Sequence, residues 1–121
     1  MTNTNINSTY YLGKYTYVTV TVLNKGLIDQ YDYLTIAHTN ATEYADKIWN
    51  KLSEMGDYEK SEAFQALTDE AADEWYDEYN SVYDRYHAAD SKAFSLDKAR
   101  DAVKEAILAL EEYETLCDTN M

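Results

Sequence analysis

The sequence predicts an α+β fold, in which an N-terminal antiparallel β-hairpin of two or three strands is followed by three or four helices. A segment in which β-branched and aromatic residues alternate indicates the hairpin, and apolar residues at helical spacing occupy the rest of the chain. Proline is absent and glycine occurs three times, which disfavours long irregular loops. We expect one domain over 1–121, with a frayed end at 1–9, a β-hairpin at 10–38 and an acidic helical part at 39–121.

The hairpin is predicted from residues 15–23, where three valines alternate with tyrosines and threonines. This period of two is typical of a strand with one buried face. The segment 24–26 would form the turn because its glycine tolerates a positive φ, and a second strand is expected at about 27–37. A short additional strand at 10–12 would join the same sheet.

One face of this hairpin would carry four tyrosines, which are Tyr15, Tyr17, Tyr31 and Tyr33. Tyrosine combines an apolar ring with a polar hydroxyl, so it suits surfaces that are partly buried or that contact a partner. Either a further helix or a partner covers this face, and a second copy of the chain is one such partner.

The first helix is expected to begin at the capping-box-like segment 40–43 and to end at Gly56. A second helical region spans about 58–88, with a break near Thr68, whose hydroxyl would cap the acidic segment. The last helix is expected to begin at Ser95. The apolar stripe of the second region consists of Ala72, Trp75, Tyr79, either Val82 or Tyr83, and Tyr86.

The formal net charge is −13, and all of it lies in the second half of the chain. Residues 1–53 carry four acids and four lysines, whereas residues 54–121 carry 19 acids and six bases. A chain of this charge repels DNA, RNA and anionic lipid, so we expect a basic protein partner and no direct nucleic-acid or membrane contact. The apolar content of 45% argues against a disordered acidic tail.

No motif for Ser/His/Asp or Cys/His catalysis is present in the sequence. The sequence has no glycine-rich phosphate loop and no calcium-binding loop, so we expect no cofactor and no metal. The single cysteine, Cys117, cannot form an internal disulfide, and no secretory leader is recognisable near the N-terminus. We therefore expect a non-enzymatic, cytoplasmic protein.

The densest acidic segment is 68–86, and on a helix its carboxylates form two neighbouring rows. The aspartate row is Asp69, Asp73 and Asp77, and the glutamate row is Glu70, Glu74 and Glu78. The rows carry about one charge per 2.5 Å of helix axis, which is of the same order as the roughly one per 1.7 Å of duplex DNA. Repulsion within them costs roughly 1–3 kcal/mol, which interleaved lysines would have avoided.

The segments TDEAADEWYDEYNSVYDRY (68–86) and EEYE (111–114), in a small tyrosine-rich chain, resemble the phage-encoded DNA-mimic proteins of the anti-restriction and anti-CRISPR type. The resemblance implies an inhibitor that occupies the basic DNA- or RNA-binding cleft of a defence protein in the host cell. Tyr76 lies off the apolar stripe, so we expect it to be exposed and to contact the partner, because arginines stack on rings as well as pair with carboxylates. The expected partner-binding residues are Glu62, Asp69, Glu70, Asp73, Glu74, Tyr76, Asp77, Glu78, Asp84, Glu111, Glu112 and Glu114.

Two alternative functions stay open. The chain could be a homodimeric interaction protein that pairs through its tyrosine face, with the acids as a solvated surface only, and a salt-adapted proteome would also produce such a surface. It could instead be a small metal-dependent hydrolase, because Glu59, Glu62, Glu74 and Asp77 resemble the E-x-x-E…E-x-x-D metal site of nucleotide pyrophosphohydrolases. The spacing between the two halves of that motif is short, and a β-hairpin does not fit an all-helical enzyme.

Overall fold

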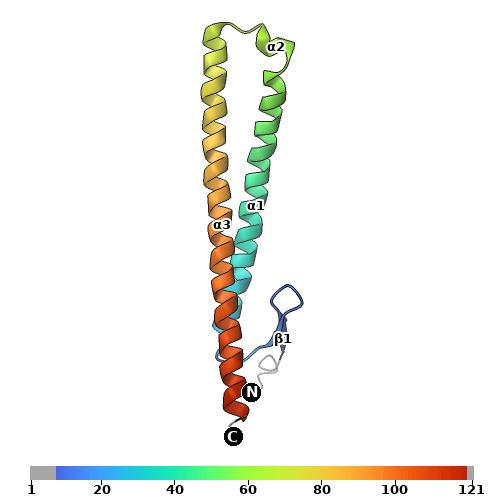
Figure 1. Ribbon diagram of the computed structural model, residues 1–121, viewed down its shortest axis with the longest axis vertical. Helices are drawn as coiled ribbons and strands as arrows, with labels where there is room; N and C mark the ends of the chain where they lie inside the picture. Colours follow the sequence, from blue (N-terminus) through green and yellow to red (C-terminus); the bar gives the residue numbers. More distant parts are fainter. Residues whose placement is uncertain (1–7, 120–121) are drawn as a thin grey trace. The chain divides into compact units, whose positions relative to one another are not determined.

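A computed structural model describes residues 8–119, with side chains as far as Leu116. In chain order the elements are β1 (Thr9–Tyr11), β2 (Tyr17–Thr19), α1 (Lys25–Glu59), α2 (Glu62–Gln65) and α3 (Asp69–Thr119). An antiparallel hairpin followed by helices confirms the predicted arrangement in outline (Figure 1). Of the residues expected to fray, 1–7 lie outside the described part of the chain.

The chain divides into two compact units, which we describe separately. Unit 1 combines the residues up to Ala37 with those from Leu96 onward, and unit 2 is His38–Ser95. The hairpin, the first turns of α1 and the last part of α3 belong to unit 1. The rest of α1, the short helix α2 and the acidic beginning of α3 belong to unit 2.

The hairpin of unit 1 lies closer to the N-terminus than predicted. Strands β1 and β2 pair antiparallel with Tyr10 opposite Val18, so the short strand expected at 10–12 is one half of the hairpin. The turn contains Gly13 at φ 86°, followed by Lys14 at 53° and Tyr15 at 61°. Glycine adopts this left-handed conformation freely, whereas it costs the two side-chain-bearing residues about 1 kcal/mol each.

The strand expected at 27–37 and the turn expected at 24–26 are wrong, because α1 begins at Lys25. One series of its buried and half-buried positions recurs at alternating intervals of three and four residues, which is the spacing of one helix face. These positions are Tyr31, Leu34, His38, Ala41, Ala45, Ile48, Leu52 and Met55. Burial of this face overrides the strand propensity of the tyrosines and isoleucines near its start.

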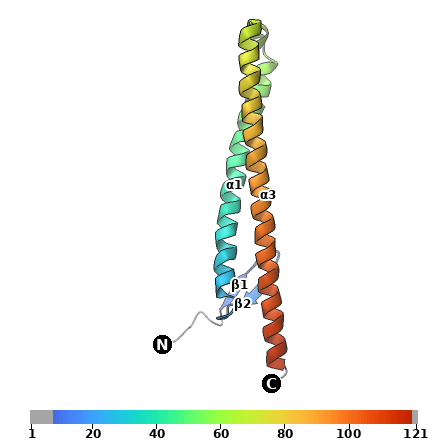
Figure 2. The ribbon, with the colours of Figure 1, turned by 90° about the vertical axis from the view of Figure 1, so that its left-hand side faces the viewer.

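The core of unit 1 joins the hairpin to both long helices. Its buried residues are Leu12 and Val18 from the hairpin, Ile28 from α1 and Ile107 from α3. Figure 2 shows β1 and β2 beside the first turns of α1 and the last turns of α3. The strand predicted over 15–23 is shorter than expected, since β2 ends at Thr19.

Asn24 connects β2 to α1 and is completely buried. Its side-chain Oδ1 accepts a hydrogen bond of 2.8 Å from the Thr21 backbone N–H, and its Nδ2 donates one of 3.0 Å to the Thr19 carbonyl. The buried amide therefore has partners for both of its polar atoms, which offsets the cost of removing it from water. Asn24, a residue of the expected hairpin turn, is instead a buried residue between β2 and α1.

The predicted tyrosine face is divided between the helix and the hairpin. Tyr31 lies on α1 and donates a hydrogen bond of 2.7 Å from its hydroxyl to the Leu12 carbonyl. Tyr15, Tyr17 and Tyr33 are exposed. The four tyrosines thus do not form one sheet face.

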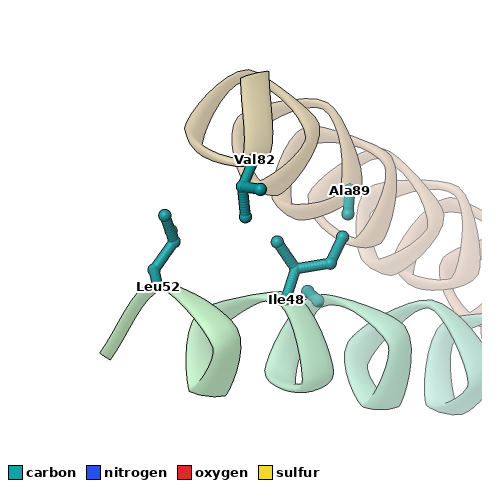
Figure 3. Close-up of a cluster of buried hydrophobic side chains, with 5 residues drawn as sticks. Ile48, Leu52, Val82 and Ala89 are labelled. Carbon is teal, nitrogen blue, oxygen red and sulfur yellow. The ribbon is translucent and has the colours of Figure 1, made fainter. Parts of the chain in front are cut away.

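In unit 2, α1 and α3 pack side by side around a small apolar core. Val82 and Ala89 of α3 point toward Ile48 and Leu52 of α1 (Figure 3), with Ala45 in the same cluster. The apolar stripe predicted for α3 is confirmed with Val82 as its fourth member, since Val82 is buried and Tyr83 is exposed. The other members, Ala72, Trp75, Tyr79 and Tyr86, are half-buried.

The helix starts predicted at 40–43 and at Ser95, and the helix end predicted at Gly56, are wrong. Segment 40–43 and Gly56 lie inside α1, and Ser95 lies inside α3. Capping residues and glycine are tolerated in a helix interior when the buried face continues on both sides. The break near Thr68 is confirmed. Its Oγ1 accepts a hydrogen bond of 3.2 Å from the Ala71 backbone N–H, so Thr68 caps the acidic helix as predicted.

Candidate protein-binding surface

The first turns of α3 present an exposed surface of carboxylates, which we call the acidic face. All of its side chains are exposed, and it consists of Asp69, Glu70, Asp73, Glu74, Asp77, Glu78 and Asp84. Val82 on the same helix is completely buried against α1, so the acidic face points away from the core. Successive residues of each row rise by about 6 Å along the helix.

The cap and the core support this helix against its own repulsion. Asp69 and Glu70 lie in the first turn, where the helix dipole favours negative charge. The remaining carboxylates of the two rows have no such benefit. Packing of the apolar stripe therefore has to offset their repulsion, as tertiary contacts do for most helices.

The two carboxylate rows have different surroundings. The side chain of Lys51 on α1 lies 3.6 Å from Glu78 at the end of the glutamate row. Arg85 follows Glu78 by seven residues and so lies on the same side of α3. Within residues 8–116, no ion pair reaches the aspartate row. The uncompensated charge is therefore concentrated on the aspartate side.

Aromatic rings follow α3 in a ladder with contacts every four residues. Trp75 stacks on Tyr79 with 5.3 Å between ring centroids, and Tyr79 stacks on Tyr83 at 6.3 Å. The His87 ring then meets Tyr83 edge-on at 4.5 Å. Tyr79 is half-buried as predicted, whereas Tyr83 reaches the surface.

A cluster of four rings joins α2 to both long helices. Phe64 of α2 lies 4.9 Å from Trp75 and 5.8 Å from both Tyr58 and Tyr76, measured between ring centroids. Such edge-to-face contacts contribute about 0.5–1.5 kcal/mol each beyond area burial. The exposed Glu62 lies on the same short helix. Sequence spacing did not identify Phe64, which lies inside the helical region predicted at about 58–88 but is not part of its apolar stripe.

Tyr76 is exposed as predicted, with 42% of its surface accessible. Its hydroxyl donates a hydrogen bond of 2.6 Å to Glu59 Oε2 at the end of α1. This bond raises the pKa of the Tyr76 hydroxyl, because the neutral form is the hydrogen-bond donor. The hydroxyl is therefore occupied, and the ring is the part of Tyr76 that remains open to a partner.

The three glutamates expected near the C-terminus belong to unit 1. Glu111 Oε2 accepts a hydrogen bond of 3.1 Å from the Thr19 backbone N–H, and Glu114 Oε1 accepts one of 3.1 Å from the Thr21 hydroxyl. Glu112 is exposed. Glu111 and Glu114 thus attach the hairpin to α3, and their binding to a partner stays a prediction.

Within the described residues, no three His, Cys, Asp or Glu side chains are arranged to hold a metal ion. The helices of that same part of the chain contain no stretch apolar enough to cross a membrane. No protein-family model, curated protein or solved structure matches this chain. Its function therefore has to be inferred from its own residues.

Proposed function

We propose that this protein inhibits a nucleic-acid-binding protein by placing the acidic face of α3 in that protein's basic DNA- or RNA-binding cleft. The observation that carries the proposal is the pair of exposed carboxylate rows on one packed helix. The partner would be a defence protein of the host cell, of the restriction or CRISPR kind, as the resemblance to DNA-mimic proteins implies. This mode of inhibition needs no cofactor and no catalytic step.

The mechanism is competition for the cationic groups of the cleft. Carboxylates take the places of phosphates, and the charge density of the helix is of the same order as that of a duplex. Because the helix is packed against α1, the backbone that carries its carboxylates is folded before binding. Binding therefore avoids the ordering cost that a disordered acidic tail would meet.

Affinity capture from a host lysate tests this proposal with two charge-reversal variants. The first carries Asp73→Lys and Asp77→Lys in the aspartate row. The control carries Asp101→Lys and Glu105→Lys, which are also exposed, four residues apart and on α3, but in unit 1. Both variants change the net charge equally.

We expect the wild-type protein and the control to retain nucleic-acid-binding proteins, and we expect the first variant to lose them. A duplex or single-stranded oligonucleotide should release the retained proteins. The proposal is wrong if both variants behave alike, or if the retained proteins have no affinity for nucleic acid.

The second candidate function is that of an interaction protein that forms a homodimer through the exposed tyrosines of the hairpin. Tyr15 is 92% exposed and Tyr17 59% exposed, and a patch of exposed apolar side chains can mark a protein–protein contact. Sedimentation of the wild-type protein and of a Tyr15→Ser, Tyr17→Ser variant tests it. A dimer that this variant disrupts and that salt leaves unchanged would favour the second candidate.

A further inference from the structure

We infer that Tyr76, together with the adjacent aspartate row, forms a docking subsite for arginine side chains of the partner, in preference to lysine. The inference rests on the proposed function, since it specifies the chemistry that the acidic face recognises. It also divides that face into a contacting aspartate side and a less involved glutamate side.

The first argument is the uneven distribution of positive charge around α3. Lys51 lies within 3.6 Å of Glu78, and Arg85 lies on the same side of the helix. A cationic partner approaching the glutamate side would meet these two positive charges. Among the described residues no ion pair reaches the aspartate side, which therefore offers charge complementarity to a cationic partner.

The second argument is the exposed ring beside the aspartate row. Tyr76 follows Asp73 by three residues and Asp69 by seven, so both carboxylates lie on its side of α3. Its hydroxyl is bonded to Glu59, which brings a third carboxylate to the same ring. One exposed aromatic ring therefore stands among three carboxylates.

The third argument is that this ring is held in place by its neighbours. The Tyr76 ring meets Trp75 edge-on at 5.0 Å and Phe64 at 5.8 Å, between centroids. With its hydroxyl bonded as well, the ring loses little freedom when a partner binds. The position of the Tyr76 ring is therefore restricted by these contacts before a partner binds.

Arginine fits this combination better than lysine does. A guanidinium is planar and weakly hydrated, so it can lie on an aromatic ring while it donates two parallel hydrogen bonds to a carboxylate. An ammonium is a compact, strongly hydrated charge that gains less from the ring. We expect a preference for arginine of about twofold to fivefold, the range of an exposed cation–π contact.

Octaarginine and octalysine, which carry the same charge, test the preference by titration at fixed salt. We expect wild-type protein to bind octaarginine more tightly, Tyr76→Phe to keep the preference because it keeps the ring, and Tyr76→Leu to lose it. Tyr33→Leu, which removes an exposed tyrosine of α1 in unit 1, serves as the control. It should bind both peptides as the wild-type protein does.

Matched neutralisations test which side of α3 makes the contact. Asp69→Asn with Asp73→Asn should weaken octaarginine binding more than Glu70→Gln with Glu74→Gln, although each pair removes two charges at the same spacing. Equal effects, or a preference that survives in Tyr76→Leu, would overturn the inference. If both peptides bind the wild-type protein equally, the inference fails and the proposed function stands. If neither binds, both fail.

Discussion

At the scale of single residues, the two units depend on side chains in very different surroundings. Val82 is completely buried and lies directly beneath the acidic face, between α3 and α1. Tyr10 on β1 is half-buried and donates its hydroxyl to Asp32 on α1. Val82 contributes to stability through packing alone, and Tyr10 contributes through its hydrogen bond to the Asp32 carboxylate.

Replacing Val82 tests the packing beneath the acidic face. Val82→Ala removes two buried methyl groups and leaves a cavity, so we expect a loss of about 2 kcal/mol in the free energy of unfolding. The control Val22→Ala changes the same side chain where it is exposed, and should alter stability by less than about 0.5 kcal/mol. Chemical denaturation measures both, and equal losses would contradict the described core.

Raising the pH tests the contact between Tyr10 and Asp32. Burial, and then the hydrogen bond to Asp32, raise the pKa of the Tyr10 hydroxyl well above its ordinary value of 10.0. A raised pKa means that folding favours the neutral phenol. This contribution to stability is complete below pH 10 and is lost as the pH rises toward the pKa of the folded state.

We therefore expect the free energy of unfolding to fall above pH 10, and to fall less steeply in Tyr10→Phe. The exposed control Tyr33→Phe should follow the wild-type curve. Urea denaturation at a series of alkaline pH values measures the slopes. Parallel slopes for wild type and Tyr10→Phe would show that the phenol does not contribute in this way.

At the scale of elements, α1 and α3 are longer than local signals predict. Sequence reasoning identified the hairpin, the break at Thr68 and the helical stripe of α3, because each has a local spacing or capping signal. It placed the second strand wrongly because residues 27–37 are rich in strand-forming side chains. It also ended one helix at Gly56 and began another at Ser95. The three- and four-residue spacing of buried positions from Tyr31 onward is the signal that would have identified α1.

Gly56→Ala distinguishes a helix interior from a helix end by the sign of its effect. Gly56 lies inside α1, has no positive φ, and a Cβ atom there would meet nothing within 4 Å. Alanine should therefore raise the free energy of unfolding by about 0.5–1 kcal/mol. A glycine that closed the helix in the left-handed conformation would instead make Gly56→Ala destabilising. Thermal and chemical denaturation report the sign.

Ser95→Ala makes the same distinction on α3. An exposed serine inside a helix is a weaker helix former than alanine, so the substitution should stabilise by a few tenths of a kcal/mol. A serine that served as an N-cap would lose about 1 kcal/mol on replacement. A measured loss of that size would contradict the continuity of α3 through this residue.

The sequence predicted the candidate surface only where its residues lie on a single helix. The spacing of the aspartate and glutamate rows is visible in the sequence, and their exposure agrees with it. Contacts between elements are not visible in this way. The bond between Tyr76 and Glu59 spans 17 residues, and those that join Glu111 and Glu114 to the hairpin span 92 and 93.

At the scale of the whole molecule, the governing property is the unequal distribution of charge along the chain. The net charge of −13 arises entirely from residues 54–121. Exposed charges interact over about a Debye length, which is roughly 10 Å at 0.1 M salt. A partner bound through the acidic face should therefore dissociate steeply as salt increases, whereas a dimer of exposed tyrosines should respond little.

The most direct test of the central claim measures whether nucleic acid and this protein exclude each other on the captured partner. Labelled nucleic acid is titrated onto the partner at increasing concentrations of wild-type protein, and of the Asp73→Lys, Asp77→Lys variant. We predict that the apparent Kd for nucleic acid rises linearly with the concentration of wild-type protein and reaches no plateau. The variant should barely change this apparent Kd. A ternary complex of partner, protein and nucleic acid, or an apparent Kd that the wild-type protein leaves unchanged, would contradict the claim that the acidic face occupies the nucleic-acid site.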